Sequence, residues 1–492
     1  MTETELISLS IAADTEYFPT VNFAAKQCAT KLGFAPRDAD RICLALEEAM
    51  ANAIKYGYGG TNDRLHISLT RASMGIKIIL RSRGLTLDQK HLPQYDPALA
   101  HDAQDTTGLS FHLIQKLVDT VSRAVRDDGQ ITVTMLKQLP LPRPVESEVQ
   151  QNGKAPRAPK QEVTHSIRRA SPEDAEAISR LALRSHGTVM FSEQIYYPER
   201  VREMIESGEM TSALVVTDAG VVMGHGALVA QEPGGCIEEL TYGVVDSRFR
   251  SQGCASKLAE FLMDEATERG VYALQAFAVT SHVHSQRAIE HLEYKECALL
   301  LAASPPARHW DDNQGGEPGR IGNLVYVKFL QPPKPLELYV PPRHREMVAR
   351  LYANMDAPFQ FVDAGQGPAP TGPAQLFTLA NFAEGWSLIG IQSYGADTAT
   401  QVRKELDNAL SANISSIQLM LPLHDPATAT LCTEFEAMGF FFAGVGTGPD
   451  RSENLILQYL NGVDAGYDSV HVHSDMAKEL VEYVRSCDEG KE

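Results

Sequence analysis

The chain has little that would tie it to an oxidising compartment or to a membrane. Its seven cysteines are scattered over 492 residues without a C-x-x-C pair, so we expect reduced thiols rather than a disulfide framework or a zinc site. No apolar run is long enough to cross a bilayer. The opening residues, MTETELISLS, lack the basic and apolar regions of a signal peptide. These absences predict a cytoplasmic protein that does not enter a membrane.

Positive charge is also scarce. Lysine and arginine total 44 against 63 aspartates and glutamates, which gives a formal net charge of −19. Because phosphate contacts require a surplus of basic side chains, this balance excludes nucleic acid as a general partner. A cationic partner, such as a protein lysine or a polyamine, is compatible with it.

What is present is the composition of folded domains, divided by two boundaries. Hydrophobic residues make up 43% of the chain and charged residues 22%, and a length of 492 residues predicts about three domains. Residues 139–163, rich in proline, glutamine and charge, are typical of a flexible linker. QPPKP at 331–335 marks a second boundary. The predicted domains are therefore 1–138, 164–331 and 332–492.

The stretch EELTYGVVDSRFRSQGCASKLAE, residues 238–260, carries the most informative chemical pattern. An apolar strand over 240–245 runs into a short loop and then into an amphipathic helix. The backbone N–H groups of such a loop and the positive end of the helix dipole point at one spot, which suits a pyrophosphate. The loop glycine lets the backbone approach the anion closely. The loop residues are Arg250, Ser251, Gln252, Gly253, Cys254 and Ala255.

The R-x-x-G-x-A pattern of this loop, placed after such a strand, resembles the acetyl-CoA loop of GNAT-type acyltransferases. The order of predicted strands and helices over 164–331 is similar to that family along nearly the whole segment. The resemblance implies that acetyl-CoA binds through residues 250–255 and through the end of the strand, at Val244 and Val245. The alternative is an ordinary strand–helix turn, because so short a pattern also arises by chance.

Acyl transfer to an amine needs a base for the amine and a donor that polarises the thioester carbonyl. Strand alternation places Glu239, Thr241, Gly243 and Val245 on one face. Glu239 stands fourteen residues before the loop glycine, and by the resemblance this is the position of the general base in histone-acetyltransferase-like members. A mostly apolar pocket would raise the pKa of that carboxyl. A solvated or salt-bridged strand residue is the alternative, for which Glu238 is the better candidate.

The helix predicted over 285–292 departs from the family pattern. The tyrosine that often protonates the leaving thiolate falls at Ile289, so that acid is absent or is supplied by His284, Ser285 or water. His282 takes the place of the usual asparagine, and either histidine could instead cap the helix. A glutamate, Glu293, stands where the family has a glycine at the helix end.

Residues 332–492 repeat part of this plan. The strand, polar turn and helix of 274–300 are echoed over 417–445, where Asp425 and a following proline predict a helix start. Met438-Gly439-Phe440 resembles the end of the GNAT fourth helix, yet no R-x-x-G-x-A precedes it. The pattern predicts a second, degenerate GNAT-like fold without an acetyl-CoA loop. An unrelated α/β domain is the alternative.

The N-terminal segment carries a different motif. RICLALEEAMANAIKYGY, over 41–58, predicts a helix on which Leu44, Glu48 and Ala51 share one stripe. Glu48 and Asn52 lie one turn apart and can hold Mg²⁺ and a water beside a triphosphate. E-A-x-x-N-A-I-x-x-x-Y resembles the N-box of GHKL ATPases, in the subgroup of anti-sigma-factor serine kinases. By that resemblance Glu48 is the catalytic base and Asn52 the Mg²⁺ ligand, with a solvated helix face as the alternative.

The rest of the nucleotide pocket is only partly kept. A T-G-L run resembles the later glycine box, which covers the phosphates. In the first glycine box, D-x-G-x-G, a serine replaces the aspartate that hydrogen-bonds adenine, and Thr86 replaces the second glycine. Because the charge-assisted bond to adenine is lost, we expect a GHKL fold whose ATP hydrolysis is slow or absent. The residues implied at this site are Glu48, Asn52, Ser82, Gly84, Thr107, Gly108 and Leu109.

These features predict a multidomain protein of mixed α/β and α+β class: a GHKL sandwich, a GNAT fold and a degenerate GNAT-like fold. The first predicted function is acetyl-CoA-dependent N-acyl transfer to a protein lysine or small amine. Its N-terminal domain would be regulatory, with ATP and Mg²⁺ as candidate ligands and a protein as candidate partner. The alternative is an anti-sigma-factor-type signalling protein or serine kinase whose GNAT folds are sensory or structural. The intact loop over 250–255 and the altered glycine box favour the enzyme.

Overall fold

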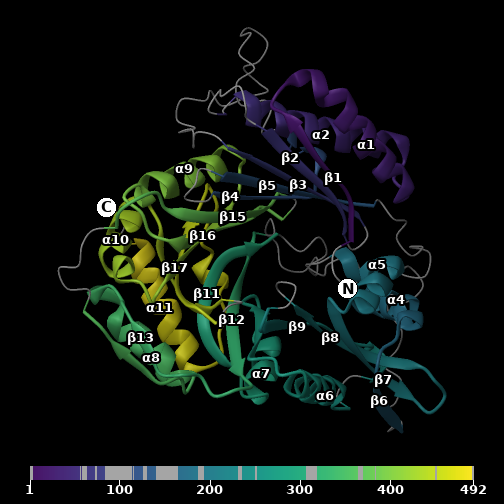
Figure 1. Cartoon of the computed structure of the whole chain (residues 1–492). Coiled ribbons are helices and arrows are strands. Elements are labelled where there is room, and N and C mark those ends of the chain that lie inside the picture. Colours follow the sequence, from purple (N-terminus) through teal and green to yellow (C-terminus); the bar gives the residue numbers. More distant parts are fainter. Residues whose placement is uncertain are drawn as a thin grey trace.

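The computed structural model spans the whole chain of 492 residues (Figure 1). It describes residues 4–55, 57, 64–72, 75–83, 113–114, 116–125, 130–139, 164–186, 193–230, 235–249, 252–305, 319–363, 370–382, 384–448 and 451–489. Beyond Leu139, the predicted linker lies outside these described residues.

The N-terminal block, β1 to β5, is an antiparallel sheet with two helices packed over an aliphatic core, as the sequence predicts (Figure 1). The strand order is β1-β2-β3-β5-β4. Its elements are β1 (Thr4–Ala12), α1 (Phe18–Lys31), α2 (Pro36–Lys55), β2 (Arg64–Ala72), β3 (Gly75–Arg83), β4 (Thr120–Val125) and β5 (Gln130–Gln138).

The stripe predicted over Leu44, Glu48 and Ala51 is not the buried face of α2. Leu44 is 40% exposed and lies on the outer side of the helix. Glu48, Ala51 and Asn52 are half-buried. The reason is that another set of apolar residues has the better helical spacing and turns its own stripe inward. That buried set is Ala39, Ile42, Ala45, Leu46, Ala49 and Met50.

The central block, β6 to β12, alternates strands and helices in nearly the predicted order. The strand order is β6-β7-β8-β9-β10-β12-β11, with β9 and β10 parallel and the other neighbours antiparallel. Its elements are β6 (His165–Arg169), α4 (Ala175–His186), α5 (Pro198–Ser207), β7 (Met210–Thr217), β8 (Val222–Ala230), β9 (Ile237–Val245), α6 (Cys254–Glu268), β10 (Ala273–Val279), α7 (His284–His291), β11 (Lys295–Ser304) and β12 (Ile321–Phe329).

The C-terminal block, β13 to α11, repeats the second half of the central block. The order β15-β16-β17-β19-β18, with β16 and β17 parallel, matches β8-β9-β10-β12-β11. Its elements are β13 (Leu336–Leu338), α8 (Arg345–Asn354), β14 (Phe359–Phe361), β15 (Gln375–Asn381), β16 (Trp386–Ser393), α9 (Thr398–Ser411), β17 (Ser416–Pro422), α10 (Pro426–Ala437), β18 (Phe441–Thr447), β19 (Glu453–Leu460) and α11 (Asp475–Glu489).

One continuous sheet joins the three blocks (Figure 1). The edge strand β4 of the N-terminal block pairs antiparallel with β15 of the C-terminal block, from Thr120 opposite Asn381 to Val125 opposite Leu376. The strands β11 and β18 meet where Ala298 lies opposite Gly444. A Cβ at Gly444 would lie 2.4 Å from the Ala298 Cα, so only glycine allows this approach.

The central and C-terminal blocks also share one hydrophobic core. Within it, the buried Gln458 side chain accepts from the Leu301 N–H at 2.9 Å and donates to the Leu301 carbonyl at 2.7 Å. An amide that replaces a strand partner in this way satisfies both backbone groups of a buried residue. The two blocks therefore pack as one body.

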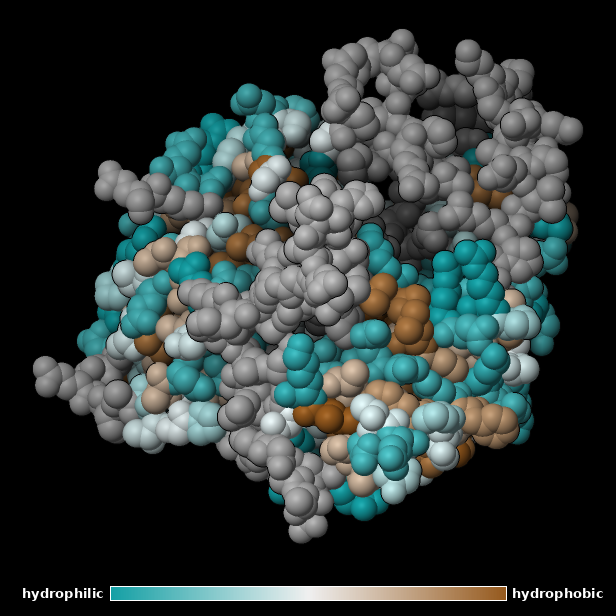
Figure 2. All heavy atoms as spheres, turned by 90° about the horizontal axis from the view of Figure 1, so that it is seen from above, coloured by the Kyte–Doolittle hydropathy of each residue, from teal (hydrophilic) through white to brown (hydrophobic). Residues whose placement is uncertain are grey.

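One face of the molecule is mixed in polarity. Figure 2 shows one face of the molecule, on which hydrophobic residues form small patches among hydrophilic ones. No helix in the described part of the chain is long and apolar enough to cross a membrane.

Candidate functional site

The central block opens at the junction of its two parallel strands. β9 and β10 pair from Ile237 opposite Ala273 only as far as Glu239 opposite Gln275. Beyond that pair the strands separate, while β10 stays bonded to β12 on its other side. Phe277, the next residue on the Gln275 face, is 39% exposed because no β9 residue covers it. We call this separation of the two strands beyond Glu239 the opening.

A bulge lies on β9 just beyond this point. The β8–β9 register shifts between His225 opposite Val244 and Ala227 opposite Thr241, and Tyr242 has a positive φ of 53°. One inserted residue moves the following side chains to the other face. The predicted alternation is therefore wrong beyond Thr241, because Val244, not Gly243 or Val245, shares the face of Glu239.

A buried histidine holds the bulge. His225 Nδ1 lies 3.0 Å from the Tyr242 carbonyl, and His225 Nε2 lies 2.6 Å from the Ser212 hydroxyl. Burial lowers the pKa of His225 to about 4, against the raising effect of the Tyr242 carbonyl. The ring is therefore neutral at neutral pH. Because a carbonyl only accepts, Nδ1 carries the proton and Nε2 accepts from Ser212.

Two neighbouring glutamates on β9 have different surroundings. Glu238 is buried and bound by both terminal nitrogens of Arg269, each at 2.6 Å. Glu239 has no cation partner among the described residues. Burial raises the pKa of Glu239 to about 6, which the Thr241 hydroxyl partly offsets. Glu239 is thus the carboxyl of this pair that can exchange a proton near neutral pH.

The turn after β9 is anchored by a buried carboxylate. Asp246 accepts from Arg248 Nε at 3.0 Å and from its terminal nitrogen at 2.7 Å, and Arg184 lies 3.6 Å away. Burial works to raise the pKa of Asp246, but the bonds from Arg248 outweigh it and lower the pKa. This ion cluster fixes the direction in which the chain enters the loop.

The N-terminus of α6 has the features expected of an anion site. Gly253 is its N-cap residue with a φ of 74°, and no described side chain caps the helix. The first N–H groups of α6 therefore keep their capacity to bind an anion. Arg250 and Ser251 lie outside the described residues.

The other loop residues differ in what they can offer a ligand. Cys254 packs in the core, and burial raises the pKa of its thiol, so only its backbone is available. Gln252 is half-buried and Ala255 is exposed. A small side chain at Ala255 leaves room above the helix end for phosphate oxygens.

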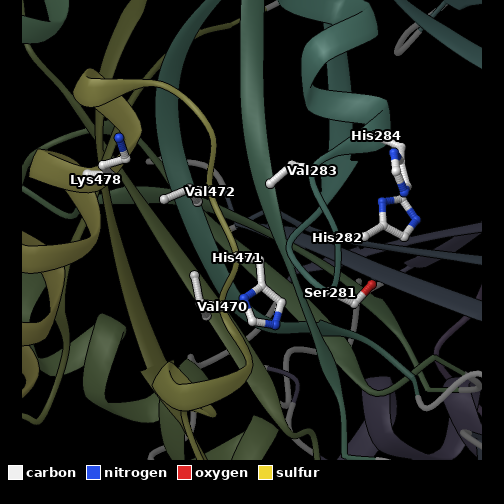
Figure 3. Close-up of a pocket in the computed structure, with 8 residues that line it drawn as sticks. All are labelled: Ser281, His282, Val283, His284, Val470, His471, Val472 and Lys478. Carbon is white, nitrogen blue, oxygen red and sulfur yellow. The ribbon is translucent and has the colours of Figure 1, made fainter.

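The N-terminus of α7 lies at the same end of the sheet. Its N-cap residue is Val283, with no side-chain cap, so neither His282 nor His284 caps the helix. Residues 281–284 line an open pocket of about 620 Å³ (Figure 3). Its opposite wall comes from residues 470–472 and Lys478 of the C-terminal block. Burial lowers the pKa of His282, and the neighbouring His284 lowers it further.

A strap from the C-terminal block, residues 470–474, holds α7 in place. The His471 N–H donates to the Thr280 carbonyl at 2.7 Å. The buried Gln286 side chain donates to the His471 carbonyl at 2.8 Å and accepts from the His473 N–H at 3.1 Å. The pocket beside His284 is thus built from both blocks.

The end of α7 keeps the shape of the family's glycine turn. Glu293 adopts a left-handed φ of 64°, and Gly439 at the end of α10 has a φ of 101°. The glutamate therefore makes the turn that a glycine makes in the C-terminal block, at some strain.

The nucleotide motif is only partly described. Glu48 and Asn52 lie half-buried near the end of α2, and Ser82 is buried on β3, on the face of Ile78 and Leu80. Gly84, Thr107, Gly108 and Leu109 lie outside the described residues. Asn52 remains a predicted Mg²⁺ ligand.

Sequence reasoning missed several residues around the opening. His225 lies in an apolar strand and reads as a core residue, and nothing in the local pattern marks its bond to the bulge. Phe277 is the one aromatic residue of its strand, ALQAFAV, which was an available signal. Gln286 and the strap meet over a separation of more than 180 positions, for which the sequence carries no signal.

Two family models match the chain. A histidine kinase-like ATPase domain matches residues 11–137, and an acetyltransferase (GNAT) domain matches residues 171–300. The second match contains Glu239, the loop and the N-terminus of α7. Neither match extends into the C-terminal block.

Curated relatives match a stretch of this chain about as long as the first of these two segments. The serine-protein kinase RsbW of Bacillus velezensis is 26% identical over 143 residues, which are 28% of this chain and 88% of that protein. RsbW of Bacillus licheniformis is 27% identical over 141 residues, which are 27% of this chain and 86% of that protein.

Solved structures resemble about a third of the chain. An N-acetyltransferase from Staphylococcus aureus Mu50 is 19% identical and covers 34% of this chain and 99% of its own, with a TM-score of 0.28. The structure of yncA from Salmonella typhimurium, with its cofactor acetyl-CoA, is 17% identical and covers 34% of this chain and 95% of its own, with a TM-score of 0.29.

Proposed function

Because residues 11–137 form a histidine kinase-like ATPase domain and residues 171–300 a GNAT acetyltransferase domain, we propose that the chain is an acetyl-CoA-dependent N-acyltransferase that acts on an amine. The observation that carries the proposal is Glu239. It is a carboxyl without a cation partner among the described residues, with a pKa of about 6, at the point where β9 and β10 separate. A group with such a pKa serves as a general base near neutral pH.

In this proposal each element of the opening has one task. The N-terminus of α6 and the loop over 250–255 bind the pyrophosphate of acetyl-CoA. The backbone N–H of Val244 or Val245, beyond the bulge, donates to the thioester oxygen. The amine nitrogen bonds to the carbonyl carbon as the carbon–sulfur bond breaks. Glu239 first takes the proton that makes the amine cationic, and the second N–H proton, released as the carbon–nitrogen bond forms, reaches the thiolate through His284 or water.

The acceptor is a cationic amine in its resting form. A net charge of −19 attracts such a molecule over long range, and Glu239 then removes its proton. A protein lysine and a small polyamine both satisfy this chemistry.

The N-terminal block has a regulatory task in the proposal. Its likeness to serine-protein kinases of the RsbW type supports a protein partner and a nucleotide site, and its pairing with β15 gives it a route to the C-terminal block. ATP and Mg²⁺ are the candidate ligands, at Glu48 and Asn52. Because Ser82 stands where the family has an aspartate, we expect slow ATP hydrolysis or none.

The test of the enzymatic proposal is Glu239→Gln in the full chain, assayed with acetyl-CoA and a panel of amines. The amide keeps the shape but cannot take a proton, so the rate should fall about 10²-fold or more at pH 7. The wild-type rate should decline below pH 6, and the deficit should shrink at high pH as the amine deprotonates unaided. Glu260→Gln, an exposed change on α6, is the matched control and should act as wild type.

Stability gives a second measurement on the same variant. Since the folded pKa of Glu239 lies above its ordinary value of 4.5, the folded protein binds this proton more tightly, and stability falls as pH rises from 4.5 to 6. At pH 7 Glu239→Gln should therefore be more stable than wild type, by up to about 2 kcal/mol. Equal rates for the two proteins over pH 6–9 would show that Glu239 is not the base.

A further inference from the structure

Three side chains in the C-terminal block converge away from the opening. His344 Nδ1 or Nε2, the Cys432 Sγ and a Glu436 carboxylate oxygen all lie within 4.8 Å of one another. His344 and Cys432 are fully buried, and the Glu436 side chain is 10% exposed. His344 directly precedes α8, whereas Cys432 and Glu436 lie one turn apart on α10. Such an arrangement presents one nitrogen, one sulfur and one oxygen donor to a common point.

The hydrogen bonds around His344 bear on which ring nitrogen carries the proton. The Tyr483 hydroxyl lies 2.9 Å from the Arg343 carbonyl, to which it can donate, and 2.8 Å from His344 Nδ1. When the hydroxyl donates to the carbonyl, it accepts from Nδ1. In the neutral ring, Nε2 then presents its lone pair to the Glu436 Oε1 at 2.9 Å. Two acceptors at that distance require a cation or a second proton between them.

The outer contacts are those that hold metal ligands in proteins. The Glu436 Oε2 is bound by Arg343 at 3.1 Å, which leaves Oε1 directed at His344. A ligating histidine usually donates its other N–H to a fixed acceptor, and a ligating carboxylate is itself hydrogen-bonded. Tyr483 and Arg343 supply these two contacts.

The thiol distinguishes a metal site from a simple ion pair. A second proton on His344 would satisfy Glu436 but would leave Cys432 without a polar role. The Cys432 Sγ lies within 4.8 Å of both the His344 nitrogen and the Glu436 oxygen, so the sulfur is a third donor that a hydrogen-bonded histidine–glutamate pair does not need.

We propose that His344, Cys432 and Glu436 bind a zinc ion, or a divalent metal of the same class, with water as the fourth ligand. Mixed nitrogen, sulfur and oxygen donors in a buried site are typical of zinc. The ion would join α10 to the segment before α8, and through Tyr483 to α11. Its role is structural, because no described pocket residue belongs to the cluster.

The test is metal binding by the full chain, purified without chelators. Elemental analysis should find one zinc per chain, and protein stripped with EDTA should bind zinc again. Cobalt in place of zinc should give the intense near-ultraviolet absorption of a thiolate–cobalt bond. Cys432→Ser should abolish that absorption and weaken zinc binding by more than about 100-fold, and Tyr483→Phe should weaken it about 10- to 100-fold. Cys297→Ser removes another buried thiol and should bind as wild type.

Two results would overturn the proposal. One is stripped protein that is folded by circular dichroism but takes up neither zinc nor cobalt. The other is a Cys432→Ser protein that binds zinc as tightly as wild type. If Cys432→Ser fails to fold, Glu436→Gln repeats the test. The amide keeps the volume of the side chain, and besides the proposed ligand atom it alters only the bond from Arg343. Loss of zinc binding in that folded variant supports the site, and unchanged binding contradicts it.

Discussion

The central and C-terminal blocks share an order of strands and helices but differ at the helix that would receive an anion. In the central block Gly253 precedes α6, and no described side chain caps that helix. In the C-terminal block Asp397 precedes α9. Its carboxylate accepts from the Ala374 N–H at 2.7 Å and from Gln401 at 2.8 Å. A fixed negative charge at this place repels a phosphate.

The backbone of the second loop is also occupied. The Ala396 N–H donates to the Gly372 carbonyl at 2.8 Å, and the Gly395 N–H donates to the Thr398 hydroxyl at 2.8 Å. At the start of α6, by contrast, no described side chain caps the backbone N–H groups. The Gly395 and Ala396 N–H groups are bonded within the protein and are therefore not available to a ligand.

The parallel strands differ in the same direction. β16 and β17 stay paired through Gly390, two residues before the inserted position that follows Ile391, whereas β9 and β10 are paired only through Glu239, three residues before Tyr242, so pairing extends one residue further in the C-terminal block. The last residue paired before the register shift is Thr241 on β9 and Ile391 on β16. Two residues before it, β9 has Glu239 and β16 has the buried Ile389. The comparison teaches that a fold can persist while the positions that we propose for an anion and for a base carry other side chains.

The largest expected effect comes from placing a carboxylate at the first loop. Gly253→Glu should reduce acetyl-CoA affinity by more than about 100-fold, because like charges in contact cost several kcal/mol. Calorimetry on the full chain measures this directly. The variant makes the central loop resemble the C-terminal one in charge.

A control separates charge from backbone strain at this position. Gly253 has a positive φ, and no atom lies within 4 Å of an added Cβ. Gly253→Asn tolerates that backbone and adds no charge, so it should bind acetyl-CoA within about 10-fold of wild type. Equal binding by wild type and Gly253→Glu would mean that the pyrophosphate is held elsewhere.

A smaller effect is expected at the histidine that holds the bulge. His225→Ala leaves the Tyr242 carbonyl without its donor, so the backbone N–H groups beyond the bulge lose their position. Misplacement of this kind costs about 100-fold in turnover. The KM for acetyl-CoA should change little, since the loop is untouched.

Two replacements test whether the bond or the bulk of His225 matters. Asparagine places an N–H where Nδ1 donates to the Tyr242 carbonyl, whereas glutamine places its amide toward Ser212. His225→Asn should therefore restore most of the turnover that His225→Ala loses, and His225→Gln should not. Equal losses in all three variants would assign His225 to packing alone.

Local patterns predicted most elements of the two blocks. The strand over 273–279 and the start of α10 at Asp425, whose carboxylate accepts from the Ala427 N–H at 2.8 Å, are as the sequence indicates. α5 was missed although Pro198 and the left-handed Gly208 frame it. These features depend on neighbours along the chain, which is why they are readable.

What could not be predicted depends on contacts between distant segments. A single inserted residue at Tyr242 reversed the expected face of Val244, and alternation alone does not reveal an insertion. The strap reaches Gln286 from residues 470–474, and the cluster at His344 gathers three polar side chains from separate segments. Ligand spacing along the sequence marks only sites built from one stretch of chain.

The smallest expected effect lies in the C-terminal loop, where opening the anion site should not restore binding. Asp397→Asn removes the negative charge and turns an N–H₂ group toward either Ala374 or Gln401, so one of its two hydrogen bonds is lost. The cost should be about 1 to 3 kcal/mol of stability, measured as a shift of the denaturation midpoint. Acetyl-CoA should still bind at one equivalent per chain, because the Gly395 and Ala396 N–H groups stay bonded and Ile389 still fills the base position. A second equivalent in calorimetry would contradict this and would show that Asp397 alone separates the two loops.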